Sequence, residues 1–89
     1  MTPRLARRTR LKWDEARGAS VLLYPEGLLV LTPEAAEIVA RIDGATSLDA
    51  LVAGLAADHP EAPPEVIARD VRELLERLRD RGFVALEPP

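Results

Sequence analysis

The sequence predicts an α+β fold in which a three-stranded antiparallel sheet is followed by three helices, in the order βββααα. Before residue 32, apolar residues alternate with polar ones or form short runs bounded by turn residues, as in strands. After residue 32, they recur at spacings of three and four, as in helices. The 89 residues, 47% of them apolar, can form one modest core. We therefore expect a single domain over residues 1–89, ordered from about residue 5 to residue 86.

The first strand is predicted over residues 7–13, where the side chains alternate in character. One face would carry Thr9, Leu11 and Trp13, and Trp13 is expected in the core against the helices. The opposite face would be solvated and basic, and it comprises Arg8, Arg10 and Lys12. Positive side chains on an edge strand discourage unwanted pairing, so we place this strand at an edge of the sheet.

The second and third strands are predicted as a hairpin, over residues 19–24 and 27–31. Its turn, Tyr24–Gly27, contains Pro25, which presets φ, and Gly27, which can supply a left-handed residue for a bulge. Both arms are almost wholly apolar, whereas a strand with one face in water alternates polar and apolar residues. The second face of the hairpin is therefore expected to meet another apolar surface, either in this chain or on a partner.

Three helices are predicted from their caps and their apolar stripes. The expected starts are Thr32–Pro33, Thr46 or Ser47, and Pro64, and the expected ends are Asp43–Gly44, Asp58–Pro60 and Arg81–Gly82. The third helix has its acids early and its arginines late, which suits the helix dipole. After it, Phe83–Leu86 would add a short strand or close the core, and Glu87–Pro89 are expected to be disordered.

Composition argues against catalysis. There is no cysteine, so disulfides and thiolate metal sites are excluded, and a cytoplasmic location is natural. His59 is the single histidine, which cannot build a metal site alone and is expected at the surface. No glycine-rich phosphate loop and no activated nucleophile stands out. No apolar run approaches the ~20 residues that a membrane-spanning helix needs. We therefore expect a binding module with no cofactor and no metal.

Three kinds of binding module remain open. A winged helix-turn-helix would bind DNA through the third helix, but that helix balances five arginines with five acidic residues, and the chain has no Asn or Gln to read adenine. An extended peptide could instead add itself as a strand along residues 27–32, if that segment lies at a sheet edge. A quinone carrier is the third kind, for which Trp13 and Tyr24 offer little aromatic surface.

Several ordered runs of residues resemble the PqqD family, small proteins of pyrroloquinoline quinone (PQQ) biosynthesis. They are L-L-Y-P-E-G-L-L-V-L-T-P-E-A-A-E-I-V at 22–39, I-D-G at 42–44, S-L-D-A-L-V at 47–52 and D-V-R-E-L-L-E-R-L-R-D-R-G-F-V at 70–84. The run R-L-K-W-D at 10–14, with Arg17, resembles the first strand and turn of the family. One departure is Ile42, where relatives often carry a cysteine. We expect Ile42 to pack in the core, so this departure bears little on function.

The resemblance implies a precursor-peptide recognition element with a winged-helix fold. Such a protein is a peptide chaperone that binds the ribosomal precursor peptide PqqA and presents it to PqqE, a radical S-adenosylmethionine enzyme. It implies neither a nucleic-acid partner nor a membrane partner. The expected state is a monomer, although an open sheet edge can also pair two copies into a dimer.

The resemblance also implies where the peptide lies. In related recognition domains the peptide adds to the third strand of the sheet, in a cleft beside the third helix. Here the strand side of that cleft would be Leu28, Leu29, Val30 and Leu31. The helix side would be Arg69, Val71, Arg72, Leu75 and Arg79. We place the enzyme contact on the basic face of the first strand, at Arg8, Arg10 and Lys12.

Overall fold

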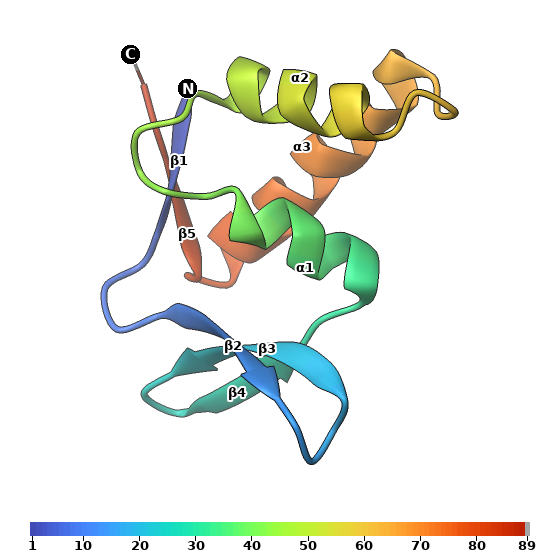
Figure 1. Ribbon diagram of the computed structural model, residues 1–89. Helices are drawn as coiled ribbons and strands as arrows, with labels where there is room; N and C mark the ends of the chain where they lie inside the picture. The colour runs from blue at the N-terminus through green and yellow to red at the C-terminus, as the bar shows by residue number, and fades with distance from the viewer. Residues whose placement is uncertain (89) are drawn as a thin grey trace.

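The computed structural model describes residues 1–88, and three helices and two antiparallel sheets lie within that range (Figure 1). The elements are β1 (Thr2–Leu5), β2 (Arg10–Asp14), β3 (Ala19–Tyr24), β4 (Gly27–Val30), α1 (Pro33–Ala40), α2 (Leu48–Asp58), α3 (Pro64–Asp80) and β5 (Val84–Glu87). The predicted α+β class is confirmed. The predicted order βββααα is incomplete, because one strand precedes these elements and another follows them. Within residues 1–88, no helix is long and apolar enough to cross a membrane.

The predicted meander is present as the antiparallel sheet β2-β3-β4. Leu22 in the middle of β3 stands opposite Leu11 of β2 on one side and Leu29 of β4 on the other. Gly27 pairs directly with Tyr24, so the turn holds only Pro25 and Glu26 and contains no bulge. Since β3 is central, β2 and β4 are both edges of this sheet.

The structure corrects two predictions about the first strand of the meander. β2 begins at Arg10 rather than at residue 7, because Arg8 has a φ of 65° in the turn before it and lies outside the strand. Trp13 is 54% exposed rather than buried. It pairs with Ser20 near the β2–β3 turn and does not pack against either core cluster, whereas Leu11 packs against the cluster next to the sheet.

The chain ends form a strand pair that the sequence did not indicate. β1 and β5 pair antiparallel, from Thr2 opposite Glu87 to Leu5 opposite Val84, so the first and the last strand of the chain lie side by side (Figure 1). The open question about Phe83–Leu86 is thus settled in favour of a strand. Glu87 belongs to that strand, which corrects its assignment to a disordered tail. Pro89, the last residue of that predicted tail, lies outside the described residues.

Arg4 links the β1-β5 pair to the loop before α2 through two hydrogen bonds. Its Nε donates to Glu87 Oε1 at 2.8 Å, and its Nη2 donates to the carbonyl oxygen of Gly44 at 3.3 Å. The N–H of Leu48 also donates to the carbonyl of Met1 at 2.7 Å. These contacts hold the N-terminal strand β1 against the loop that precedes α2.

The helices begin at the predicted caps. Thr32 Oγ1 accepts from the N–H of Ala35 at 3.1 Å, and Ser47 Oγ accepts from the N–H of Ala50 at 3.1 Å. Ser47 is therefore the cap of α2, while the Thr46 hydroxyl donates to Asp43 Oδ2 at 2.9 Å. α1 is shorter than predicted and ends at Ala40, since Asp43 and the residues after it form a separate turn.

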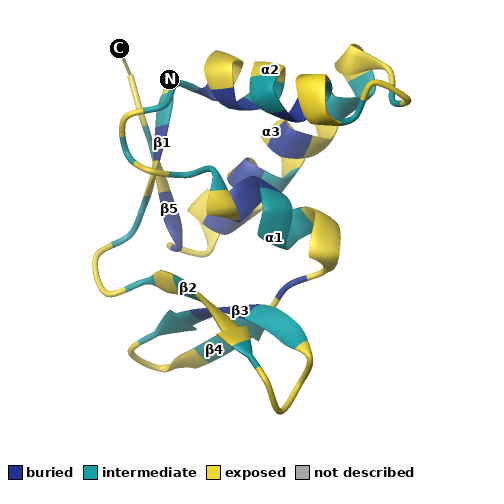
Figure 2. Cartoon of the chain, viewed as in Figure 1, coloured by how far each residue is buried: buried dark blue, intermediate teal, exposed yellow. Residues whose placement is uncertain are grey.

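The core consists of two apolar clusters, and the buried segments of the chain lie in the interior between its elements (Figure 2). The lower cluster lies between the sheet and the helices and contains Leu22, Leu31, Val39, Leu78, Phe83 and Val84. The upper cluster lies among the helices and contains Ile38, Leu48, Leu51, Leu55, Val71 and Leu75. Ile42 packs against both clusters, as the sequence predicted.

Candidate functional site

β4 presents an open sheet edge. Among the described residues, β4 is hydrogen-bonded to β3 alone. The N–H of Leu31 donates to the carbonyl of Ser20 at 2.9 Å, which sets the alternation along the strand. Because main-chain groups alternate in direction in an antiparallel pair, Leu29 also faces β3, whereas the N–H and C=O groups of Leu28 and Val30 face the open edge. These four polar groups are free to pair with another extended chain.

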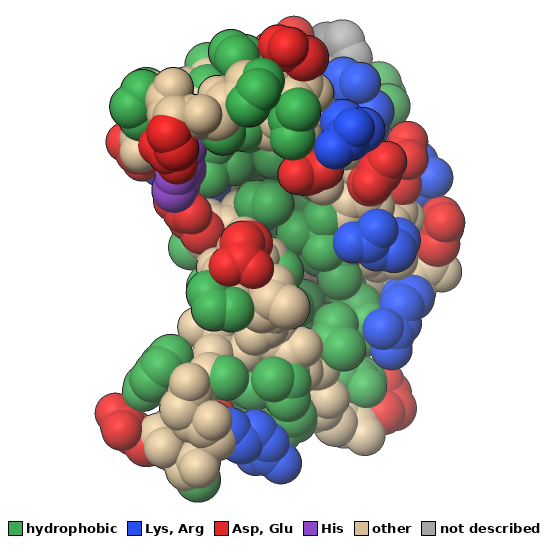
Figure 3. All heavy atoms as spheres, turned by 90° about the vertical axis from the view of Figure 1, so that its right-hand side faces the viewer, with side chains coloured by type: hydrophobic (Ala, Val, Ile, Leu, Met, Phe, Trp, Pro, Cys, Tyr) green, Lys and Arg blue, Asp and Glu red, His purple; other side chains and the backbone are tan. Residues whose placement is uncertain are grey.

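A cleft lies between β4 and α3. Its volume is about 240 Å³, and it is lined by Leu29, Val30, Leu31, Thr32, Ala35, Leu74, Arg77, Leu78 and Arg81. Figure 3 shows apolar side chains gathered in the hollow of this face, with basic and acidic side chains interspersed along its right-hand side. The cleft thus joins an apolar floor to an unpaired strand edge and a basic rim.

The rim of the cleft carries uncompensated positive charge. Arg77 and Arg81 stand one helical turn apart, and neither forms an ion pair with any residue in the range 1–88. Arg81 instead lies over the ring of Phe83, with its guanidinium carbon 5.3 Å from the ring centroid. By contrast, Arg69 and Arg79 each lie within 3.4 Å of the carboxylate of the next residue. The cleft arginines are therefore available to an acidic ligand.

The structure places the predicted strand residues at the cleft or beside it. Leu29, Val30 and Leu31 line the cleft, and Leu28 lies on the same edge strand. The predicted helix residues are not brought to this cleft. Val71 and Leu75 are 1% and 0% exposed and belong to the core cluster among the helices. Arg69, Arg72 and Arg79 are exposed on other sides of α3.

The error lies in the phase of α3. The residues that pack among the helices and the residues that line the cleft belong to two neighbouring stripes of the helix, because a rotation of about 100° separates consecutive residues such as Leu74 and Leu75. The stripe that lines the cleft continues as Leu74, Arg77, Leu78 and Arg81. Their spacing of three and four was visible in the sequence. The spacing alone could not show which of the two stripes of α3 faces β4, because the two stripes are equally regular.

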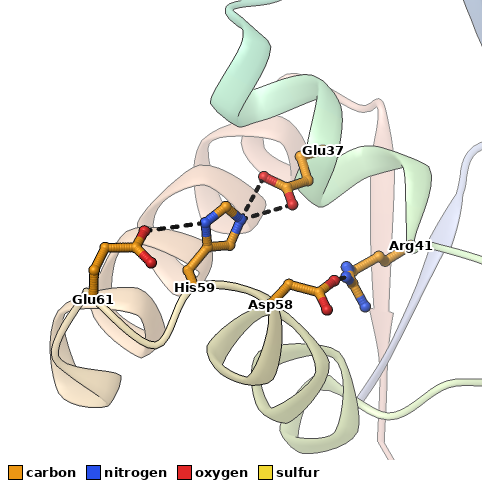
Figure 4. Close-up of polar contacts among 5 residues, drawn as sticks. All are labelled: Glu37, Arg41, Asp58, His59 and Glu61. Carbon is orange, nitrogen blue, oxygen red and sulfur yellow. Dashed lines mark hydrogen bonds and ion pairs between the residues drawn. The ribbon is translucent and has the colours of Figure 1, made fainter.

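A second polar cluster joins α1 to the loop after α2 (Figure 4). His59 Nε2 lies 2.8 Å from Glu37 Oε2, and His59 Nδ1 lies 3.4 Å from Glu61 Oε2. Arg41 forms an ion pair with Asp58 beside it. The hydrogen bond to Glu37, followed by the charge of Glu37, raises the pKa of His59. Among residues 1–88, no group of three potential ligand side chains could hold a metal ion.

The His59 cluster predicts a pH-dependent contribution to stability. Because the pKa of His59 is raised on folding, its contribution is fully present below the unfolded-state pKa of about 6.5 and is lost as pH rises through the higher folded-state value. Urea unfolding should therefore show a larger difference between the wild type and His59→Gln at about pH 5.5 than at about pH 8.5. Glu37→Gln removes the main partner and should flatten the same profile. An equal difference at both pH values would contradict this prediction.

Residues 19–84 match the model of a protein family, "Coenzyme PQQ synthesis protein D (PqqD)". The chain belongs to the PqqD family. It is 42% identical over 84 residues to the PqqA binding protein of Azotobacter vinelandii, covering 94% of this chain and 89% of that one. It is 38% identical to the PqqA binding protein of Stutzerimonas stutzeri, with the same coverage.

A solved PqqD structure has the same fold. It is the solution NMR structure of the PqqD truncation of Methylobacterium extorquens PqqCD, described as a functional and stand-alone recognition element for ribosomally synthesised and post-translationally modified peptides. The TM-score is 0.78 at 30% identity, over 93% of this chain and 87% of that one. The part of the chain that matches the PqqD family model contains β4 and every residue lining the cleft, whereas β1 and β2 precede it.

Proposed function

We propose that this PqqD family member binds the precursor peptide PqqA in PQQ biosynthesis, by adding the peptide to β4 as a fourth strand. The observation that carries the proposal is the unpaired β4 edge beside an apolar cleft with two free arginines. The relatives named PqqA binding protein support the choice of peptide. The role is one of recognition without catalysis.

The geometry accounts for both affinity and register. A peptide strand would lie about 4.8 Å from β4 and pair with the outward main-chain groups of Leu28 and Val30. Alternate peptide side chains would then enter the cleft between Leu29 and Leu74. Burial of apolar surface at about 25 cal/mol per Å² would dominate affinity. Exposed ion pairs with Arg77 and Arg81, worth about 0.2–1 kcal/mol each, would set orientation.

The proposal extends to delivery of the peptide. We infer that the chain acts in the cytoplasm as a monomeric winged helix-like chaperone that presents bound PqqA to the radical S-adenosylmethionine enzyme PqqE. The DNA-binding alternative finds less support, because α3 exposes acids among its arginines and two of those arginines lie against neighbouring aspartates. The quinone alternative also finds little support, because the ring of Tyr24 is already in contact with another ring of this chain. It stacks edge to face with Phe83, with the two centroids 4.8 Å apart.

A titration of the isotope-labelled chain with PqqA tests the proposal. The amide signals of residues 27–32 and 74–81 should move together as peptide is added, because strand addition and side-chain insertion occur at the same site. The amide signals of α2, which contributes no residue to the cleft, serve as the internal control and should stay in place. Shifts confined to residues 4–12 would overturn the cleft model, and binding of duplex DNA in place of PqqA would favour the alternative.

A further inference from the structure

The sheet β2-β3-β4 has a second face that points away from the helices. The register aligns Arg10, Leu23 and Leu28 across it in one row and Lys12, Val21 and Val30 in the next. These six residues define the outer face. The opposite face carries Leu11, Leu22 and Leu29, which pack in the core. Since side chains alternate along a strand, the two sets lie on opposite sides of the sheet.

The outer face combines two exposed cations, Arg10 and Lys12, with an apolar centre in which Leu23 and Leu28 are partly exposed and Val21 is 1% exposed beneath its neighbours. In Figure 1 the helices and the β1-β5 pair all lie on the other side of this sheet. Val30 is 51% exposed. A shallow depression of about 340 Å³ lies over Val21 and Leu23, with Lys12 and Asp14 on its border. A partly exposed apolar surface bordered by charged side chains is typical of a protein interface.

The charge of the outer face indicates which kind of partner surface would complement it. Arg10 and Lys12 are exposed and form no ion pair with any of residues 1–88, whereas the nearby carboxylate of Asp14 is held by Arg17 at 2.7 Å. A surface that carries carboxylates around an apolar patch complements this arrangement. A nucleic acid fits less well, because it would leave the apolar centre uncovered and would favour a more uniformly basic surface.

Strand addition would extend the outer face by one strand. Leu28 and Val30 have their free main-chain groups at the open edge and their side chains on the outer face. Peptide residues paired with them would therefore also place their side chains on the outer face, in line with Leu23 and Val21. Half of the bound segment would face the cleft, and the other half would face outward beside Leu28 and Val30.

We propose that the outer face, extended by the bound peptide, is the docking surface for the enzyme that modifies the peptide, and that this enzyme presents carboxylates around an apolar patch. The inference rests on the proposed function. It assigns the two sides of the sheet to different tasks, since the cleft side holds the peptide and the outer side offers both protein and peptide to the enzyme. Arg10, Lys12 and Val30 are the exposed residues of this chain that such an enzyme would contact.

Charge reversal at the outer face tests the proposal, with PqqE as the enzyme probe. The double variant Arg10→Glu with Lys12→Glu should bind PqqA within about twofold of the wild type, while its PqqA-loaded form should bind PqqE at least about tenfold more weakly. The matched control is Arg69→Glu with Arg72→Glu, which changes charge equally on α3. It should leave PqqE affinity within about twofold. Unchanged PqqA affinity also shows that each variant is folded.

The backbone amide signal of Lys12 supplies a second measurement. In the isotope-labelled chain, this signal should stay in place when PqqA alone is added and should shift when PqqE follows, because β2 lies at the edge of the sheet opposite to β4. PqqE binding that leaves both this signal and the charge-reversal variant unaffected would overturn the docking proposal, as would the absence of any PqqE binding. A dimer of the wild type that dissociates on charge reversal would assign the outer face to a second copy instead. Failure of PqqA to bind the wild type would overturn the proposed function itself.

Discussion

Replacing Val30 with proline is expected to weaken PqqA binding at least about tenfold while leaving the protein folded. The N–H of Val30 faces the open edge of the sheet, so its removal costs no hydrogen bond within the β2-β3-β4 sheet. Proline is tolerated on edge strands for this reason, and the preceding Leu29 is already extended, as proline requires. The bound peptide would lose one main-chain partner and would meet the pyrrolidine ring at its closest approach.

Val30→Thr is the matched control for this experiment. It keeps the branched shape and the main-chain N–H, so PqqA affinity should stay near that of the wild type. Isothermal titration calorimetry gives the affinities, and a urea unfolding curve shows whether the proline variant is still folded. Wild-type affinity in a folded Val30→Pro protein would rule out strand addition through this donor.

Truncating Leu75 to alanine is expected to lower the free energy of unfolding by about 2–5 kcal/mol, because it opens a cavity in a fully buried site. Leu75 is 0% exposed and packs in the cluster among the helices, with Leu51 and Val71. A domain of this size has about 5–15 kcal/mol of stability in total, so the loss is a large share. Urea unfolding measures it directly.

The neighbouring Leu74 is the control that distinguishes core from cleft. Its side chain is only partly buried and lines the cleft. Leu74→Ala should therefore destabilise the protein less than Leu75→Ala and should weaken PqqA binding in a protein that is still folded. If Leu75→Ala unfolded no more easily than Leu74→Ala, the phase of α3 in the structure would be wrong.

The two leucines also show how far periodicity can be read. Leu74 and Leu75 both continue regular apolar stripes, and the sequence predicts correctly that α3 buries such a surface. Helical spacing gives the angle between residues around the axis of α3. It does not show how the helix is rotated about that axis relative to the other elements. The orientation of α3 depends on contacts with β5, α2 and the sheet, so the predicted cleft wall included buried Val71 and Leu75 and omitted Arg77 and Arg81.

The hairpin around Tyr24–Gly27 was predictable because its signals are local. Two short apolar arms flank a turn, and a hydroxyl cap at Thr32 follows at once, so the strands and the start of α1 could be placed without knowledge of the rest of the chain. The excess of apolar residues in the hairpin was also visible. The structure resolves that excess into a core face at Leu22 and Leu29 and an outer face at Leu28 and Val30.

Local patterns thus sufficed for the α+β class, the meander and the helix starts. The tertiary structure alone decided the pairing of β1 with β5, the exposure of Trp13 and the side of α3 that faces β4. Each of these depends on contacts between segments far apart in the chain, as between Thr2 and Glu87. Such contacts produce no periodic pattern in the sequence of either segment. Their free energy arises only when the two surfaces meet in the folded protein.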